Sequence, residues 1–335
     1  MRVSDAIVSV VVPVFNGAAT LPTTLASILA QTHRHLEVLV VDDGSTDDTA
    51  EVIARAAAAD PRVVSVSYGA NRGRSAARNA GIDAATGSWV AFVDADDLLI
   101  ADRFEVLLDV AGRHPQSRVI TDDRWGFTVG DDGSVSMDHR YPARHTWRWG
   151  GEHLIDRRRH FTDHLGHMDP IIERRHLLAT GARYPERLSV GEDLAFCLML
   201  LFGHPDPAAI RVGRVGYYYL LAPTNRAEGG RDSWLVAMDE VVEQTGSAEL
   251  RRLVDRWQPI HSFQADYADQ GMAKVGRLGP RDVPPRPDAR PNRVAGAAFM
   301  GFLKGVRLAA SFADRPHLAG AVADIEAQLQ RGLPT

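Results

Sequence analysis

The N-terminal part of the chain alternates between short apolar segments and longer amphipathic ones. Four segments rich in apolar and β-branched residues are expected to form strands: 7–15, 36–41, 62–67 and 89–93. Continuous apolar runs of this length are typical of strands that are buried on both faces. Between them, residues 49–59 and the alanine-rich 71–81 favour helices. Alternating strands and helices predict an α/β fold with a parallel sheet.

Polar side chains gather where these strands end, which is where parallel sheets bind their ligands. The tetrad of residues 94–97, Asp-Ala-Asp-Asp, follows directly after the run 89–93. Burying unpaired carboxylates costs several kcal/mol, so they are unsuitable for a core. They are suitable ligands for Mg²⁺ or Mn²⁺, which prefer oxygen. The alternative for an isolated pair of acids is an exposed turn.

A second acidic segment follows the run 36–41. Ser45 and Asp48 have the spacing of a capping box, and Asp47 and Asp48 suit the positive end of the helix that follows. These acids are therefore explained by local structure. Asp42 and Asp43 are not, and they remain candidates for binding.

Several ordered motifs together resemble family 2 glycosyltransferases. They are VVPVFN (11–16), DDGSTDDT (42–49), NRGRSAARNAG (71–81), FVDADD (92–97) and GEDL (191–194). The resemblance covers about the first two thirds of the chain. It implies an inverting enzyme with a GT-A fold, a Rossmann-like, mostly parallel sheet flanked by helices. In detail the motifs are similar to bacterial exopolysaccharide transferases of the succinoglycan type.

The resemblance also implies where the donor binds. In the family, the acid that matches Asp43 accepts a hydrogen bond from uracil. A carboxylate suits this contact because it can only accept hydrogen bonds, and uracil offers an N–H. Arginine pairs well with phosphate, so Arg74 and Arg78 are expected beside the nucleotide, with a solvated helix face as the alternative. The full expected set is Pro13, Val14, Phe15, Asn16, Asp43, Asn71, Arg74, Arg78, Asp94, Ala95 and Asp96.

The metal roles come from the same resemblance. Asp96 matches the principal ligand of Mg²⁺ or Mn²⁺, and Asp94 matches a position near the ribose and the metal. The metal would stabilise the charge that develops on the leaving diphosphate. Asp97 is expected to cap the next helix instead.

Inverting transfer also needs a base that deprotonates the acceptor hydroxyl. The family's base matches Asp193, just before the apolar helix expected at 194–202, with Glu192 as a supporting residue. The alternative is that both acids only decorate a helix N-terminus, where acids are favoured. Residues 208–221 predict a pair of strands, and Arg226 beyond them is a candidate for supporting the diphosphate.

Composition narrows the class of protein. The chain has 335 residues, a net charge of −5, 45% hydrophobic and 24% charged residues, which predicts a globular enzyme with no nucleic-acid partner. Its only cysteine is Cys197, so a reducing, cytoplasmic compartment is expected. Within it, the inner face of the cell membrane is a second expected location. The sequence contains no uninterrupted stretch of about 20 apolar residues, so no membrane span is predicted.

We expect a glycosyltransferase domain at 1–230, with a nucleotide-binding half at about 1–120 and an acceptor half at about 121–230. A helical extension is expected at 231–335, with a proline-rich linker at 280–291. The amphipathic segment 293–312 could contact a membrane peripherally, pack on the catalytic domain or join a homo-oligomer.

Two further clusters carry weaker hypotheses. His160, His164 and His167 would share one helix face, which suggests a zinc site, although no cysteine accompanies them. The arginines at 157–159 could meet the phosphates of a lipid-linked acceptor, or form a solvated face.

The function predicted is metal-dependent transfer of one sugar from a nucleotide sugar, with UDP favoured, to a hydroxyl of a sugar or lipid-linked acceptor. The QxxRW motif of processive relatives is absent. A sugar-nucleotide nucleotidyltransferase is an alternative, but residues 16–19 lack the basic loop it needs. A non-catalytic sugar-nucleotide-binding protein would be expected to lose Asp96 or Asp193. A dehydrogenase is disfavoured because no GxGxxG follows the first strand.

Overall fold

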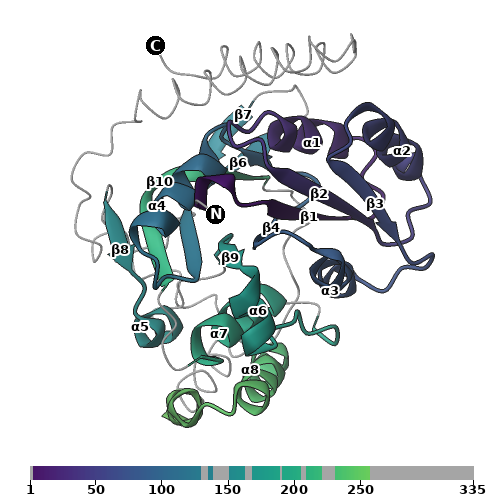
Figure 1. The fold of residues 1–335 in the computed structure, drawn as a ribbon. Helices are drawn as coiled ribbons and strands as arrows, with labels where there is room; N and C mark the ends of the chain where they lie inside the picture. The colour runs from purple at the N-terminus through teal and green to yellow at the C-terminus, as the bar shows by residue number, and fades with distance from the viewer. Residues whose placement is uncertain are drawn as a thin grey trace.

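The computed structural model describes residues 3–129, 135–138, 151–162, 168–188, 191–204, 209–220 and 231–256. Its centre is one twisted sheet with helices on both faces (Figure 1). The strands are β1 (Val8–Val14), β2 (Leu36–Asp42), β3 (Val63–Ser67), β4 (Trp89–Phe92), β5 (Leu98–Leu99), β6 (Val119–Val129), β7 (Val135–Asp138), β8 (Glu152–Leu154), β9 (Ile171–Glu173) and β10 (Ala209–Leu220). The helices are η1 (Val3–Asp5), α1 (Leu21–Leu29), α2 (Thr49–Ala59), α3 (Arg74–Ala84), α4 (Arg103–Arg113), α5 (Arg157–Thr162), α6 (Arg174–Thr180), α7 (Glu192–Phe202) and α8 (Arg231–Thr245).

The sheet order is β3-β2-β1-β4-β9-β6-β10-β5, with β7 beside β6 and β8 beside β10. The strands from β3 to β4 are all parallel, which confirms the α/β prediction for the N-terminal part of the chain. Beyond β4 the sheet is mixed, because β9 runs antiparallel to both β4 and β6. Antiparallel β9 brings its first residues to the edge where β4 ends.

Two apolar layers hold the helices to the sheet. One layer packs α1, α2 and α4 against one face, with Leu21, Ile53 and Phe104 among its buried residues. The other packs α3, α6, α7 and α8 against the opposite face. Cys197 is buried in this second layer, as expected, and burial raises the pKa of its thiol to about 12.

Two local predictions were wrong. Residues 209–220 form one long strand, β10, which pairs with β6 through register irregularities rather than folding back as a second strand. The capping box at Ser45 and Asp48 does not form, because Ser45 Oγ accepts a hydrogen bond from the Asn16 backbone amide at 2.9 Å. Asp47 instead accepts from the Thr49 amide at 3.1 Å at the start of α2.

Within the described residues 231–256 the chain is helical except at Gly246 and Ser247. Helix α8 shares the core of α7 through Met238, Val241 and Val242. Arg157 on α5 donates to Glu249 at 2.6 Å, and Arg158 also pairs with Glu249. These two arginines therefore anchor the helical segment. The linker 280–291 and the segment 293–312 lie outside the described residues.

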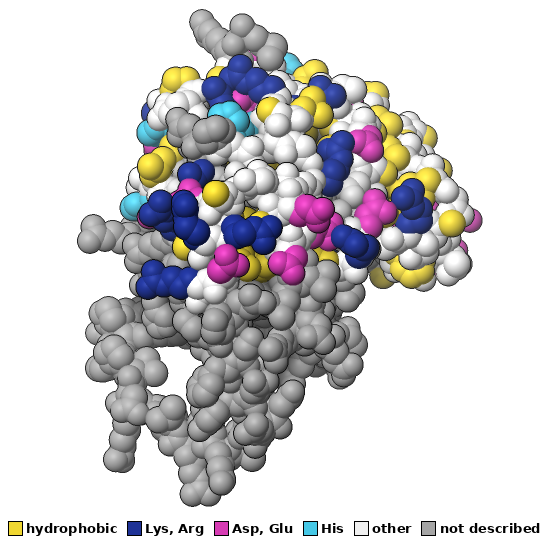
Figure 2. All heavy atoms as spheres, turned by 90° about the horizontal axis from the view of Figure 1, so that it is seen from below, with side chains coloured by type: hydrophobic (Ala, Val, Ile, Leu, Met, Phe, Trp, Pro, Cys, Tyr) yellow, Lys and Arg dark blue, Asp and Glu magenta, His cyan; other side chains and the backbone are white. Residues whose placement is uncertain are grey.

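The described surface is mixed in charge. Figure 2 shows basic and acidic side chains interspersed on the face seen from below. Some of these charges form exposed ion pairs, such as Arg183 with Asp83, at 2.7 Å between Nη2 and Oδ1. Each exposed pair contributes little to stability. No helix within the described ranges is long and apolar enough to cross a membrane.

Candidate functional site

The loops after β1 and β2 are tied together at the carboxyl edge of the sheet. Asn16 follows β1 with a positive φ of 52°, a conformation that asparagine tolerates better than most residues. Its side-chain oxygen accepts a hydrogen bond from the Thr46 amide at 2.8 Å. Pro13 and Val14 are buried in β1, whereas Phe15 is exposed beside this loop. The first expected binding segment is therefore a rigid corner with one open aromatic side chain.

Asp43 organises the start of α3. Its carboxylate is buried and accepts hydrogen bonds from the Tyr68 hydroxyl at 2.7 Å, the Arg72 amide at 2.7 Å and the Gly73 amide at 2.9 Å. Asn71 lies exposed in the same loop. A carboxylate has about four acceptor positions, so one remains for a ligand after these three contacts.

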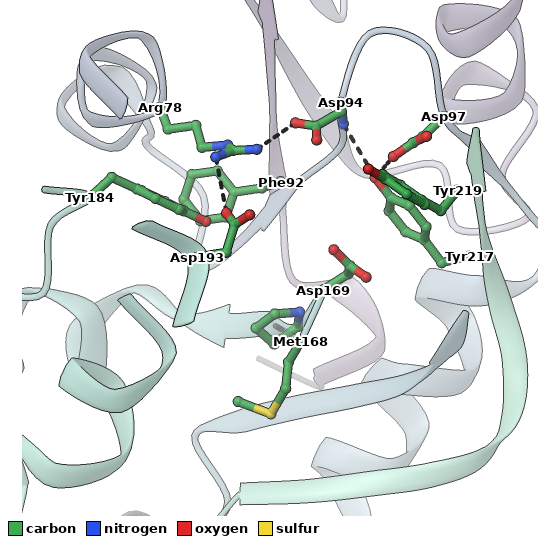
Figure 3. A pocket seen from close by; sticks show the side chains of 11 residues that line it. Arg78, Phe92, Asp94, Asp97, Met168, Asp169, Tyr184, Asp193, Tyr217 and Tyr219 are labelled. Carbon is green, nitrogen blue, oxygen red and sulfur yellow. Dashed lines mark hydrogen bonds and ion pairs between the residues drawn. The ribbon is translucent and has the colours of Figure 1, made fainter. Parts of the chain in front are cut away.

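Arg78 occupies the centre of the site (Figure 3). Its Nη2 donates to Asp94 Oδ1 at 2.8 Å, and its Nη1 donates to Asp193 Oδ1 at 3.0 Å. The guanidinium lies 4.9 Å from the centre of the Tyr184 ring. Burial alone would lower the pKa of Arg78, but the charges of Asp193 and Asp94 raise it well above its usual value. One buried cation from α3 thus joins the end of β4 to the start of α7.

Glu192 and Asp193 play different structural parts. Glu192 is buried, its Oε1 lies 3.2 Å from Arg74 Nε, and burial followed by the charge of Asp193 raises its pKa. Asp193 is partly exposed and lines a pocket. Glu192 therefore links α7 to the arginines of α3, while Asp193 faces the space where a substrate can enter.

The acids that follow β4 are crowded. Burial and then the charge of Asp94 raise the pKa of Asp96 to about 6. Asp97 is buried and accepts hydrogen bonds from the Tyr217 hydroxyl at 2.7 Å and the Leu220 amide at 2.9 Å. It does not cap the next helix, as the sequence had suggested, because α4 begins only after Asp102. Asp97 instead fixes the β4 turn to β10.

The donor set fits a hard divalent cation. Two nearby carboxylates, Asp94 and Asp96, repel each other, and this repulsion adds to burial in raising the pKa of Asp96. Across the described ranges, no group of three or more His, Cys, Asp or Glu side chains is assembled for a metal. Mg²⁺ and Mn²⁺ commonly take one or two protein carboxylates and complete their shells with phosphate and water. Asp94 and Asp96 would be the protein ligands.

The remaining candidates are less informative. His160 is fully buried on α5, and its expected partners His164 and His167 lie outside the described residues. Arg226 lies outside them too. Ala95 packs against the sheet core at the turn after β4.

A pocket of about 370 Å³, including space open to solvent, lies between the two halves of the sheet. Besides Arg78, Asp94 and Asp193, it is lined by residues that sequence reasoning did not single out for the site: Phe92, Met168, Asp169, Pro170, Tyr184, Tyr217 and Tyr219. An acid just before a short strand is the signal that could have pointed to Asp169. Only the antiparallel direction of β9 places that acid beside the end of β4.

Comparisons with known proteins agree with this geometry. The family described as Glycosyl transferase family 2 matches residues 9–178. The succinoglycan biosynthesis protein ExoO of Rhizobium meliloti is 36% identical over 194 residues, which is 56% of this chain and 53% of ExoO. Glycosyltransferase GlyA of Streptococcus pneumoniae serotype 4 is 41% identical over 107 residues, 32% of this chain and 15% of GlyA.

The crystal structure of S. aureus TarS 1–349 in complex with UDP-GlcNAc has the same fold, with a TM-score of 0.61 at 17% identity. The match covers 96% of this chain and 89% of that one, and it confirms the GT-A architecture. The chain spans only about half of ExoO, so the relatives identify the shared domain. On the family match and the fold together, the chain belongs to glycosyltransferase family 2.

Proposed function

We propose that the protein is an inverting, metal-dependent and non-processive glycosyltransferase. It moves one sugar from a UDP-linked donor to a hydroxyl of a sugar or lipid-linked acceptor, in polysaccharide or glycoconjugate biosynthesis. The observation that carries the proposal is the bridge from Asp94 through Arg78 to Asp193, at 2.8 and 3.0 Å. It holds the candidate metal ligand and the candidate base beside one pocket, as inverting transfer requires.

In this mechanism Asp193 accepts the proton of the attacking hydroxyl. The base must face both the acceptor and the anomeric carbon, and Asp193 is the partly exposed acid of its pair, with its carboxylate on the pocket. Arg78 holds that carboxylate in place through a charge-assisted hydrogen bond, which restricts it to one orientation. A pre-positioned base of this kind contributes about 10²–10⁴-fold in rate.

The nucleotide occupies the carboxyl edge of β1, β2 and β4. Asp43 has an acceptor position left for the N–H of uracil, and Arg74 lies exposed near the pocket for the diphosphate. When bound at Asp94 and Asp96, Mg²⁺ or Mn²⁺ supplies Lewis-acid stabilisation to the departing diphosphate. The UDP-GlcNAc bound to TarS and the similarity to ExoO, a succinoglycan biosynthesis protein, support a UDP donor and a polysaccharide product.

Titration calorimetry with UDP tests the donor and the metal together. We expect UDP to bind in the presence of Mg²⁺ or Mn²⁺ and to bind at least about tenfold more weakly in EDTA, because the diphosphate would then approach the carboxylates of Asp94 and Asp96 without a bridging cation. Asp96→Ala should lose this metal response. Asp83→Ala, an exposed aspartate of α3 paired with Arg183, is the matched control and should keep it.

Equal UDP affinity with and without metal would contradict metal dependence, as would a wild-type metal response in Asp96→Ala. Absence of binding to any nucleoside diphosphate would contradict the proposed reaction as a whole. Product anomers identified by NMR test the inverting outcome, since retention of the donor's anomeric configuration would exclude Asp193 as a simple base.

A further inference from the structure

The floor of the pocket carries an acid that the proposed mechanism does not use. Asp169 lies in the segment before β9, and its carboxylate points into the space among Asp94, Asp193 and Tyr217 (Figure 3). It belongs to the acceptor half of the fold, whereas Asp94 belongs to the nucleotide-binding half. The pocket therefore has acidic groups on opposite sides.

Asp169 is rigidly mounted. Its neighbours Met168 and Ile171 are buried. Its backbone carbonyl accepts a hydrogen bond from Nη2 of Arg103, a fully buried arginine that also donates to Asp122 at 2.9 Å. A side chain on such a backbone keeps its position without a ligand, which is the condition for a selective binding group.

The carboxylate of Asp169 retains acceptor capacity toward the pocket. Arg124 Nη1 lies 3.5 Å from its Oδ2, at the outer limit of a hydrogen bond, and the Arg124 guanidinium stacks 5.2 Å from the Tyr219 ring. A carboxylate offers about four acceptor positions. The aromatic rings that line the same space, such as Tyr219, supply apolar surface. Apolar walls with a few fixed polar groups are typical of small-ligand sites.

We propose that Asp169 accepts hydrogen bonds from hydroxyl groups of the sugar being transferred, and that it makes the pocket select neutral sugars over uronic acids. This inference rests on the proposed function. The transferred sugar must lie between the leaving diphosphate and the base, and the pocket lies between Asp94 and Asp193. The group that fills it is therefore the donor sugar and not the nucleotide.

Charge supports the selectivity. Asp94, Asp169 and Asp193 all line the pocket. Arg78 pairs with Asp94 and Asp193, and Arg124, which does not line the pocket, pairs with Asp169 at 3.5 Å. Acids therefore outnumber arginines among the lining residues. A sugar carboxylate placed beside Asp169 would meet a like charge in a partly desolvated space. Specific sites commonly reject a competitor by such repulsion.

Calorimetry in the presence of Mg²⁺ tests the inference with UDP, UDP-glucose, UDP-galactose, UDP-GlcNAc and UDP-glucuronate. The variants are Asp169→Asn, which keeps the shape, and Asp169→Ala, with Asp83→Asn as the control. We expect all proteins to bind UDP within about threefold of wild type, because Asp169 does not contact the nucleotide. Asp169→Ala should bind the best neutral UDP-sugar about 10- to 100-fold more weakly, as expected for loss of a charged hydrogen-bond partner.

Binding of UDP-glucuronate provides the second test. Wild type should prefer the best neutral UDP-sugar to UDP-glucuronate, and Asp169→Asn should reduce that preference at least about tenfold by removing the like charge. Unchanged UDP-sugar affinity and unchanged preference in the Asp169 variants would overturn the inference while leaving the proposed function intact. A parallel loss of affinity for UDP itself would also overturn it, because Asp169 would then organise the nucleotide site. Failure of wild type to bind UDP would overturn both.

Discussion

Replacing Asp193 by asparagine is expected to separate catalysis from binding in the proposed site. The amide has nearly the size of the carboxylate, and its oxygen can still accept the hydrogen bond that Arg78 Nη1 now donates to Asp193 at 3.0 Å. The substitution removes the charge that would take a proton from the acceptor. We therefore expect Asp193→Asn to abolish sugar transfer while the donor binds normally.

The two effects differ in size. Loss of a general base lowers the rate about 10²–10⁴-fold, or about 2.7–5.5 kcal/mol in barrier height. Replacing the carboxylate acceptor by a neutral amide, while the guanidinium donor of Arg78 stays charged, costs about 1 kcal/mol of stability. Burial, followed by the charge of Asp193, raises the pKa of Glu192, so removing that charge offsets part of the cost. The free energy of unfolding should therefore change by less than about 1 kcal/mol.

The assay is turnover at saturating donor, together with the donor dissociation constant and a urea unfolding curve for each variant. Glu192→Gln is the neighbouring control and should act mainly on stability, because Glu192 is buried against Arg74 rather than open to the pocket. Near-normal turnover by Asp193→Asn would refute the assignment of the base. An inactive Glu192→Gln with a normal fold would move the base by one residue. Loss of donor affinity in Asp193→Asn would mean that Asp193 organises the nucleotide site.

Three further outcomes follow from the structure. Arg78→Met should lower the free energy of unfolding by about 3 kcal/mol in urea titrations, since it removes the buried cation that pairs with Asp94, Glu192 and Asp193, and a loss below about 1 kcal/mol would contradict the bridge. Gly81→Ala should destabilise the protein by about 1–3 kcal/mol, because a new Cβ would lie 2.2 Å from Val11 Cγ1. The control Gly112→Ala on α4 should be neutral or stabilising, and equal melting temperatures for the two variants would refute this packing. Burial lowers the pKa of His33 and of His176, so both remain neutral in the fold below the pKa of about 6.5 that they have when unfolded. The stability that depends on their neutral form is present above that pH and is lost as pH falls, so a His33→Gln, His176→Gln double variant should flatten the decline of melting temperature between about pH 6.5 and 5.

Local pattern was sufficient to predict the helices and strands of the N-terminal part of the chain. The run 36–41 is apolar at almost every position, because a central parallel strand is covered on both faces, and β2 forms at Leu36–Asp42. Helix α2 begins and ends at the residues expected from its composition, Thr49–Ala59. In a parallel sheet all carboxyl ends meet at one edge, so the sequence also predicted that the polar segments after β1, β2 and β4 would gather there.

Tertiary structure decided which polar groups meet and what each of them contacts. Nothing in the spacing of Arg78 and Asp193, which are 115 positions apart, predicts their hydrogen bond, because α7 reaches the site only through packing on the opposite face of the sheet. Asp97 has the sequence of a helix cap but is buried against Tyr217 of β10. Asp169 enters the pocket because β9 runs antiparallel to β4, and strand direction is set by long-range pairing rather than by local composition. The sequence by itself therefore determined the elements and the edge of the sheet where the polar segments gather, and the fold determined which contacts each acid makes.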